Sequence, residues 1–125
     1  MIVGVGIDLV NPERVGRALE EHGGRFEERV FTAGERADCN ERADRVLAFA
    51  ARFAAKEACL KALGTGWSEG LAFSEVEVVR DERGAPSLRL TGAAAARARE
   101  LGVRETHVSL SHERSMAAAV VVLES

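Results

Sequence analysis

Apolar and polar positions alternate at the start of the chain, where residues 2–10 read IVGVGIDLV. Aliphatic side chains fall on one side of this segment, and Gly4, Gly6 and Asp8 fall on the other. A period of two predicts a β-strand. Glycines inside a strand commonly mark the close approach of a ligand or of another backbone. We therefore predict a strand that presents Asp8 on a glycine-lined face.

Two helix starts follow this strand. Asn11 followed by Pro12 is typical of a helix N-terminus, and this helix is predicted to end near residues 23–24. Thr32 and Glu35 have the spacing of a capping box, which predicts the start of a second helix. Residues 38–45 are polar and irregular, so they are predicted to form a loop.

The longest periodic segment runs from about residue 44 to residue 63. Its apolar side chains recur at three- and four-residue spacings and form one stripe, typical of a long helix packed on one side. The glycines of residues 64–66 are typical of a helix C-terminus. This segment is predicted to be the central helix of the fold.

The remainder of the chain reads as strands with one further helix. Strands are predicted at residues 73–80, 87–90, 106–112 and 116–123, and an alanine-rich helix is predicted from Thr91 to Gly102. Strands and helices in this order favour the α+β class, with a mostly antiparallel sheet and a long central helix. We expect a single domain over residues 1–125.

Composition narrows the function classes. The chain has 125 residues, of which 46% are hydrophobic and 30% charged, and its net charge of −3 disfavours a general nucleic-acid-binding role. No apolar run approaches the ~18–20 residues that span a bilayer, so no membrane association is expected. Cys39 and Cys59 fit neither a disulfide framework nor a CxxC zinc site. We expect a cytoplasmic protein.

Two carboxylates and two cations form a candidate phosphate-handling site. Asp8 interrupts an apolar strand, and Glu57 lies on the shoulder of the apolar stripe of the central helix. Carboxylates without cysteine or histidine beside them suit Mg²⁺, which takes one or two carboxylates and completes its shell with water and phosphate oxygens. Lys61, one turn beyond Glu57, and Arg52 on the same helix could neutralise phosphate charge.

Each of these residues also has a simpler interpretation. Asp8 could face solvent or cap the following helix, and Glu57 with Lys61 could form an i,i+4 surface salt bridge worth only ~0.2–0.5 kcal/mol. His112, at the end of a predicted strand, could be an ordinary surface residue, although histidine suits proton transfer near neutral pH.

Three motifs together resemble a known family. They are GVGIDLV at residues 4–10 with Arg14 following, RFAAKEA at residues 52–58 continuing through KALGTG at residues 61–66, and HVSLSH at residues 107–112. In order and spacing they resemble the short 4′-phosphopantetheinyl transferases, the bacterial holo-[acyl-carrier-protein] synthases, over nearly the whole chain. The resemblance implies an enzyme that moves the phosphopantetheine arm of coenzyme A to a serine of an apo acyl carrier protein. The other product is adenosine 3′,5′-bisphosphate.

The resemblance also implies roles for individual residues. Asp8 and Glu57 would hold Mg²⁺ against the pyrophosphate of coenzyme A, and Lys61 would steady or protonate the leaving phosphate. The implied coenzyme A contacts, apart from Lys61, are Arg45 (preferred over Arg42), Arg52, Gly64, Thr65, Gly66 and His112. Both Glu57, through a water, and the His112–Glu113 pair stay open as the base for the carrier serine.

The resemblance extends to partners. Family members form trimers with the active site between neighbouring subunits, so a homotrimer is expected. They meet the acidic carrier protein through arginines of their first helices, which implies Arg14, Arg25 and Arg29 here. The glutamates interleaved with these arginines are also compatible with an ordinary solvated helix face. A role in fatty-acid or polyketide synthesis is expected.

Two other function classes compete with this reading. A non-catalytic α+β binding module would use Asp8, Glu57 and Lys61 only for salt bridges, and it would need neither metal nor coenzyme A. A Mg²⁺-dependent phosphodiester hydrolase would share the metal and the cations but would need no carrier-protein surface. Neither class requires the full motif at residues 52–66. The transferase is therefore the preferred hypothesis.

Overall fold

The computed structural model describes residues 1–21, 24–65 and 70–125. The elements, in chain order, are β1 (Ile2–Val10), α1 (Pro12–Glu21), α2 (Gly24–Val30), α3 (Ala33–Asn40), α4 (Arg45–Ala62), the 3₁₀ turn η1 (Phe73–Glu75), β2 (Val76–Arg80), β3 (Pro86–Leu90), α5 (Gly92–Glu100), β4 (Glu105–Glu113) and β5 (Met116–Glu124). Within the described residues, none of the helices has both the length and the apolar character that a membrane-crossing segment requires.

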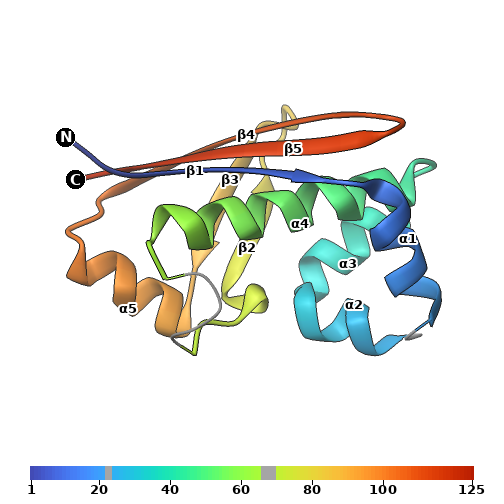
Figure 1. The fold of residues 1–125 in the computed structure, drawn as a ribbon, viewed down its shortest axis with the longest axis horizontal. Coiled ribbons are helices and arrows are strands. Elements are labelled where there is room, and N and C mark those ends of the chain that lie inside the picture. Colours follow the sequence, from blue (N-terminus) through green and yellow to red (C-terminus); the bar gives the residue numbers. More distant parts are fainter. Residues whose placement is uncertain (22–23, 66–69) are drawn as a thin grey trace.

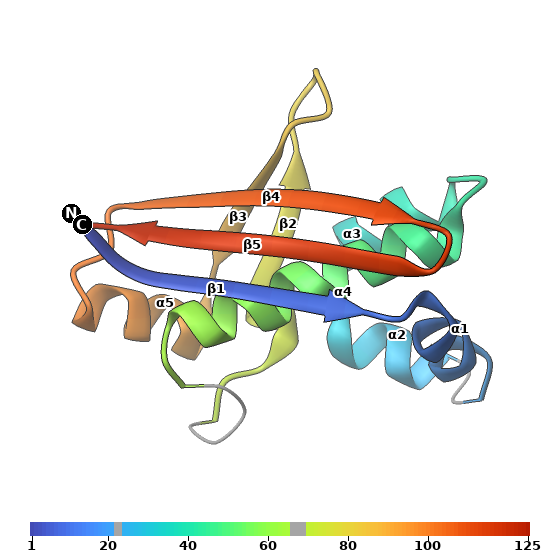
Figure 2. The same cartoon turned by 45° about the horizontal axis from the view of Figure 1, so that its top comes forward.

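The strands form two antiparallel sheets. The larger sheet has the order β1–β5–β4, so the first strand of the chain pairs with the last (Figure 2). β2 and β3 form a separate hairpin that runs across the direction of the other three strands (Figure 2). The predicted α+β class with a mostly antiparallel arrangement is therefore confirmed, with two sheets in place of one.

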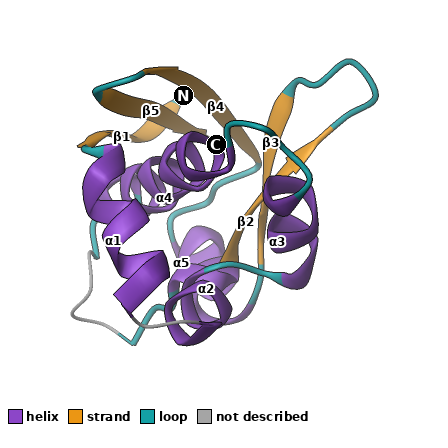
Figure 3. Cartoon of the chain, turned by 90° about the vertical axis from the view of Figure 1, so that its right-hand side faces the viewer, coloured by secondary structure: helices purple, strands orange, loops and turns teal. Residues whose placement is uncertain are grey.

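Helix α4 is the centre of the fold, as predicted. It lies along the inner face of the three-stranded sheet, and Figure 3 shows it end-on beneath β1, β4 and β5. Phe49, Leu60 and Leu63 of the predicted apolar stripe are buried, and Phe53 is half-buried. Each fully buried side chain of this size contributes ~1.5–3 kcal/mol of transfer free energy. The stripe therefore fixes which side of α4 faces the core.

The opposite face of the three-stranded sheet is apolar and open. The aliphatic side chains of β1 point away from α4, and Val5, Ile7 and Leu9 are 58%, 63% and 63% exposed. Val120 and Val122 of β5 lie beside them and are half-buried. The helices lie on the other side of this sheet, with α1–α3 at one end and α5 at the other (Figure 1). A single copy of the chain thus leaves an apolar sheet face uncovered.

Several predicted boundaries differ from the structure. Helix α2 (Gly24–Val30) was not predicted, because its seven residues are too few to show a helical period. The expected loop at residues 38–45 is shorter, since α3 extends to Asn40. The strand expected at residues 73–80 begins only at Val76, after η1. The ammonium of Lys56 binds η1 and the start of β2. It donates to the carbonyl oxygens of Phe73 and Val76 at 3.1 and 2.5 Å.

The helix caps are confirmed in part. Thr32 Oγ1 accepts from the Glu35 backbone N–H at 3.2 Å while Glu35 Oε1 accepts from the Thr32 N–H at 3.0 Å, which is the predicted capping box. Thr91, from which the alanine-rich helix was predicted to run, is the N-cap residue of α5, but its side chain makes no capping hydrogen bond. Glu75 Oε2 instead accepts from the Ala93 N–H at 2.9 Å, because η1 brings this carboxylate to the start of α5.

Candidate active site

The glycine-lined face of β1 lies directly on α4. A Cβ atom built on Gly6 would lie 1.9 Å from the carbonyl oxygen of Ala58, and one built on Gly4 would lie 2.2 Å from that of Ala62. Only glycine permits this approach of strand to helix. As a result Asp8, which follows on the same face and is 8% exposed, is held over the second half of α4.

Asp8 and Lys61 form the first contact of the candidate site. Lys61 Nζ donates to Asp8 Oδ1 at 2.8 Å and to the Ile7 carbonyl oxygen at 3.0 Å. The hydrogen bond to Asp8 raises the pKa of Lys61, so the ammonium stays charged at neutral pH. The structure therefore pairs Lys61 with Asp8, and not with Glu57 as in a simple i,i+4 surface salt bridge.

Glu57 lies beside Asp8 and is half-buried. Burial, a hydrogen bond with Asp8 and the negative charge of Asp8 together raise the pKa of Glu57 to about 7, with burial the largest cause. The positive charges of Lys61 and Arg14 act in the opposite direction. The site thus concentrates two carboxylates where a cation would relieve their repulsion.

The donor set of this site fits a hard divalent cation. Asp8 Oδ2 is buried and has no hydrogen-bond partner within the described part of the chain. A buried carboxylate oxygen without a partner is unfavourable unless a ligand satisfies it. Together with the adjacent Glu57 carboxylate, it offers the all-oxygen ligands that Mg²⁺ prefers.

A groove of about 310 Å³ opens beside Glu57. Its walls are mainly apolar, and the residues that line it include Leu9, Val15, Phe26, Phe53, Arg14 and Glu57. Arg14 also lines a neighbouring surface hollow of about 290 Å³ with Arg17 and Glu21. The groove therefore joins an arginine-bearing surface on α1 to Glu57, one of the two carboxylates.

The other predicted cations lie elsewhere in the chain. Arg45 donates to Glu27 at 2.9 Å and to Asn40 at 2.5 Å, at the junction of α2, α3 and α4. Arg52 is 1% exposed and makes an ion pair with Asp38 of α3. Within the described residues, the side-chain contacts of these two arginines join α4 to α2 and α3, and do not join it to Asp8.

The remaining predicted site residues occupy three other places. His112 is exposed at the end of β4, opposite Ala117 of β5. Gly64 has a φ of +75°, as expected for a glycine that ends a helix, and Thr65 is buried. Gly66 lies outside the described residues.

Arg25 and Arg29 are exposed on α2, and Arg14 is exposed on α1 next to the groove. One chain thus brings together Asp8, Glu57, Lys61 and Arg14 out of the predicted set.

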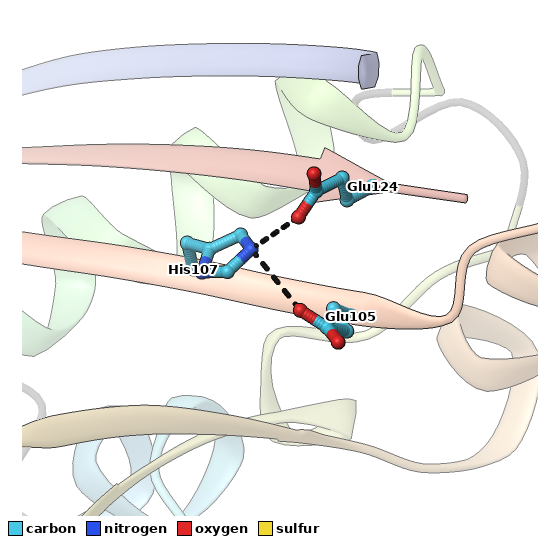
Figure 4. A group of neighbouring side chains, drawn as sticks. All are labelled: Glu105, His107 and Glu124. Atoms are coloured by element: carbon cyan, nitrogen blue, oxygen red, sulfur yellow. Dashed lines mark hydrogen bonds and ion pairs between the residues drawn. The ribbon is translucent and has the colours of Figure 1, made fainter. Parts of the chain in front are cut away.

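Two groups of residues were not identified from the sequence. Asp38, the partner of Arg52, lies in a segment that was expected to be loop. On the outer sheet face, His107 Nε2 lies 2.8 Å from Glu124 Oε1 and 3.7 Å from Glu105 Oε2, and Figure 4 shows the imidazole between both carboxylates. This second group could ligate a cation, but its exposed acidic side chains also satisfy the histidine directly. Only the pairing of β4 with β5 reveals it.

Comparison with known proteins identifies the family of the chain. Residues 4–121 match the family model of the 4′-phosphopantetheinyl transferase superfamily. The chain is 52% identical to the holo-[acyl-carrier-protein] synthase of Methylobacterium radiotolerans over 129 aligned residues, which cover 100% of this chain and 95% of that protein.

Solved structures agree in fold. The crystal structure of holo-[acyl-carrier-protein] synthase from Neisseria meningitidis matches with a TM-score of 0.89 and 33% identity, covering 100% of both chains. The Bacillus anthracis holo-(acyl-carrier-protein) synthase in complex with coenzyme A (3′,5′-ADP) matches with a TM-score of 0.82 and 37% identity, covering 100% of this chain and 98% of that one. From its sequence motifs, its fold and these matches, the chain belongs to the 4′-phosphopantetheinyl transferase superfamily.

Proposed function

We propose that this protein is a holo-[acyl-carrier-protein] synthase, which transfers the 4′-phosphopantetheine group of coenzyme A to a serine of an apo acyl carrier protein. The observation that carries the proposal is the group of Asp8, Glu57 and Lys61 beside the groove, in a chain whose relatives bear this name. The carrier serine oxygen forms a bond to the phosphorus of the arm, and the bond from that phosphorus to the bridging pyrophosphate oxygen breaks. Adenosine 3′,5′-bisphosphate leaves.

Asp8 and Glu57 are the proposed ligands of Mg²⁺. The partnerless oxygen of Asp8 and the neighbouring carboxylate of Glu57 support this assignment. When bound, the ion would neutralise negative charge on the pyrophosphate oxygens of coenzyme A. The two side chains are preorganised for this task because β1 cannot move away from α4 without leaving its glycine contacts.

Lys61 is the proposed partner of the leaving phosphate. Its ammonium is charged and its side chain is 55% exposed, so it can reach a ligand while Asp8 anchors it. An ammonium at this place stabilises the charge that develops on the leaving oxygen or gives it a proton. The carrier serine must also lose its hydroxyl proton to a base. Glu57 lines the groove and His112 does not, so we place the base that accepts this proton on the Glu57 side of the site.

Arg45, Arg52, His112 and the turn at residues 64–66 are the proposed contacts of the nucleotide part of coenzyme A. In one chain the contacts of Arg45 and Arg52 do not reach the Asp8–Lys61 pair, which favours a site completed by a neighbouring copy. The exposed apolar face of β1 and β5 supports the same conclusion, since a soluble monomer rarely leaves such a face open. We propose a homotrimer.

Arg14, Arg25 and Arg29 are the proposed contacts of the carrier protein. All three are exposed on the first two helices, and Arg14 stands at the mouth of the groove that leads to Glu57. An acidic partner docked there would present its serine to the paired carboxylates. Both cysteines are buried free thiols, which fits the reducing cytoplasm in which we place the protein and its role in fatty-acid synthesis.

The intact mass of an apo acyl carrier protein, measured after incubation with this protein, coenzyme A and Mg²⁺, tests the proposal. We expect a gain of about 340 Da, the mass of the phosphopantetheine arm, and no gain with EDTA. Asp8→Asn and Glu57→Gln should abolish the gain, whereas Glu82→Gln, an exposed control on the β2–β3 connection, should retain it. Consumption of coenzyme A without a mass gain would instead indicate a hydrolase, and no change in either would indicate a binding module.

A further inference from the structure

Three arginines and one aspartate gather where α3, α4 and β2 meet. Asp38 of α3 makes an ion pair with Arg52 of α4, and its Oδ2 lies 3.7 Å from Arg42 Nη2. Arg80 lies at the end of β2, and the charges of Arg42, Arg52 and Asp38 all act on its guanidinium. Burial lowers the pKa of the Arg80 guanidinium, the positive charges of Arg52 and Arg42 lower it further, and Asp38 opposes them. We call Arg42, Arg52 and Arg80 the arginine cluster.

The arginine cluster carries more positive charge than Asp38 can balance. Arg42 and Arg52 form ion pairs with Asp38, and Arg80 adds a third positive charge nearby, so one carboxylate stands against three guanidinium groups. The Nε atoms of all three arginines are buried and have no hydrogen-bond partner within the described residues. Arg52 is itself only 1% exposed. Buried donors of this kind are unfavourable without an acceptor, and a phosphate supplies several acceptor oxygens and up to two negative charges.

Asp38 differs from the arginines in its freedom to move. Its side chain is 43% exposed on the surface of α3, and its ion pairs with described residues are those with Arg42 and Arg52. It can leave Arg52 through a rotation of its own side chain, without unpacking the core. The Asp38 carboxylate therefore occupies the place of a bound anion in the arginine cluster, and side-chain rotation can vacate that place.

We propose that Asp38 is an internal anion that competes with the phosphomonoester of the ligand for the arginine cluster, and so sets the affinity of the enzyme for coenzyme A. The inference rests on the proposed function, in which Arg52 contacts the nucleotide. Coenzyme A carries one phosphomonoester, the 3′-phosphate, whereas its pyrophosphate is a diester. Asp38 thereby weakens the binding of ligands that carry the 3′-phosphate and leaves those without it unaffected.

Isothermal titration of coenzyme A and dephospho-coenzyme A into the intact protein tests this inference. Asp38→Asn keeps an acceptor oxygen for Arg52 but removes the competing charge. We expect the Kd for coenzyme A to become about tenfold tighter and the Kd for dephospho-coenzyme A to stay unchanged. Glu20→Gln, which removes one exposed carboxylate from α1, controls for net charge and should change neither Kd.

Thermal unfolding keeps the test decisive if Asp38→Asn lowers stability. Loss of the carboxylate leaves Arg52 buried without a counter-charge, so Tm should fall in plain buffer. Adenosine 3′,5′-bisphosphate should then raise Tm more in Asp38→Asn than in the wild type, because the ligand replaces the missing anion.

Equal Tm shifts, or weaker binding of coenzyme A by the variant, would overturn the competition and leave Asp38 as a structural partner of Arg52. Failure of the wild type to bind coenzyme A would instead overturn the proposed function.

Discussion

The close approach of β1 to α4 predicts that one methyl group will disable the site. In Gly6→Ala, the new Cβ would lie 1.9 Å from the Ala58 carbonyl oxygen, 2.8 Å from its carbonyl carbon and 2.9 Å from the Ala62 nitrogen. All three are backbone atoms of a helix, so no side-chain rotation relieves the overlap. An ordinary contact begins near 3.4 Å, so the strand must move away by about 1.5 Å.

This displacement has a thermodynamic and a kinetic consequence. Overpacking of this kind lowers the free energy of unfolding by ~1–3 kcal/mol. Alanine also reduces the conformational entropy of the unfolded chain, which offsets ~0.4–1 kcal/mol of this loss. Asp8 lies two residues further along the same strand face, so it moves away from Lys61 and Glu57. A misplacement of ~1 Å at a catalytic group can lower the rate by ~100-fold. We expect the rate of carrier modification to fall by about this factor.

Differential scanning fluorimetry and the kcat/KM for transfer to apo acyl carrier protein measure the two effects. Gly16→Ala, in helix α1, is the matched control, because its Cβ would meet only two side-chain carbons of Val46, at 3.4 and 3.8 Å. Alanine there should hold or raise Tm, since it favours the helix by up to ~1 kcal/mol, and kcat/KM should stay unchanged. If Gly6→Ala matched Gly16→Ala in both measurements, the reasoning about the strand–helix contact would be wrong.

Three further predictions concern the core, the open sheet face and the thiols. Lys56→Met should lower the free energy of unfolding in urea by ~3–5 kcal/mol, because it leaves the Glu35 carboxylate, 2.6 Å from Lys56 Nζ, buried without its cation; a loss below ~1 kcal/mol would contradict this. Ile7→Glu should reduce the molar mass measured by light scattering from that of the proposed trimer to that of one chain, and a mass equal to that of the wild type would exclude the face around Ile7 from the assembly contact. Burial raises the pKa values of Cys39 and Cys59 to about 11 and about 12, whereas thiols of the unfolded chain ionise near pH 9. Stability should therefore fall as the pH rises above about 9, and a Cys39→Ala/Cys59→Ala double variant should lose less over the same range; an equal loss would contradict this.

The sequence predicts most of the site around Asp8 because that site is built from local patterns. A glycine-lined strand face and the phase of one helix determine that Asp8, Glu57 and Lys61 can meet. The burial of Arg52 was not predictable in the same way. It depends on Asp38, whose helix α3 is short, and on how α3 packs against α4.

The outer sheet face shows a second limit of the sequence pattern. Alternation predicts that one side of β1 is aliphatic, and an aliphatic strand face is ordinarily expected to face the core. The structure turns it outward, because the glycines face α4 and the narrow space between strand and helix admits no larger side chain. The period of a strand gives its two faces but not their directions.

The pairing of β1 with β5 has a consequence for how the protein is made. Among the described elements β1 is synthesised before all others, yet it pairs with β5, the last of them along the chain, with Ile2 opposite Glu124. Contacts so distant along a chain form late and slow folding. During synthesis, the β1 segment that carries Asp8 therefore lacks its β5 partner until β5 has been translated. A chain that lacks β5 would leave β1 without its hydrogen-bonding neighbour at Asp8, so we expect truncation before β5 to abolish activity.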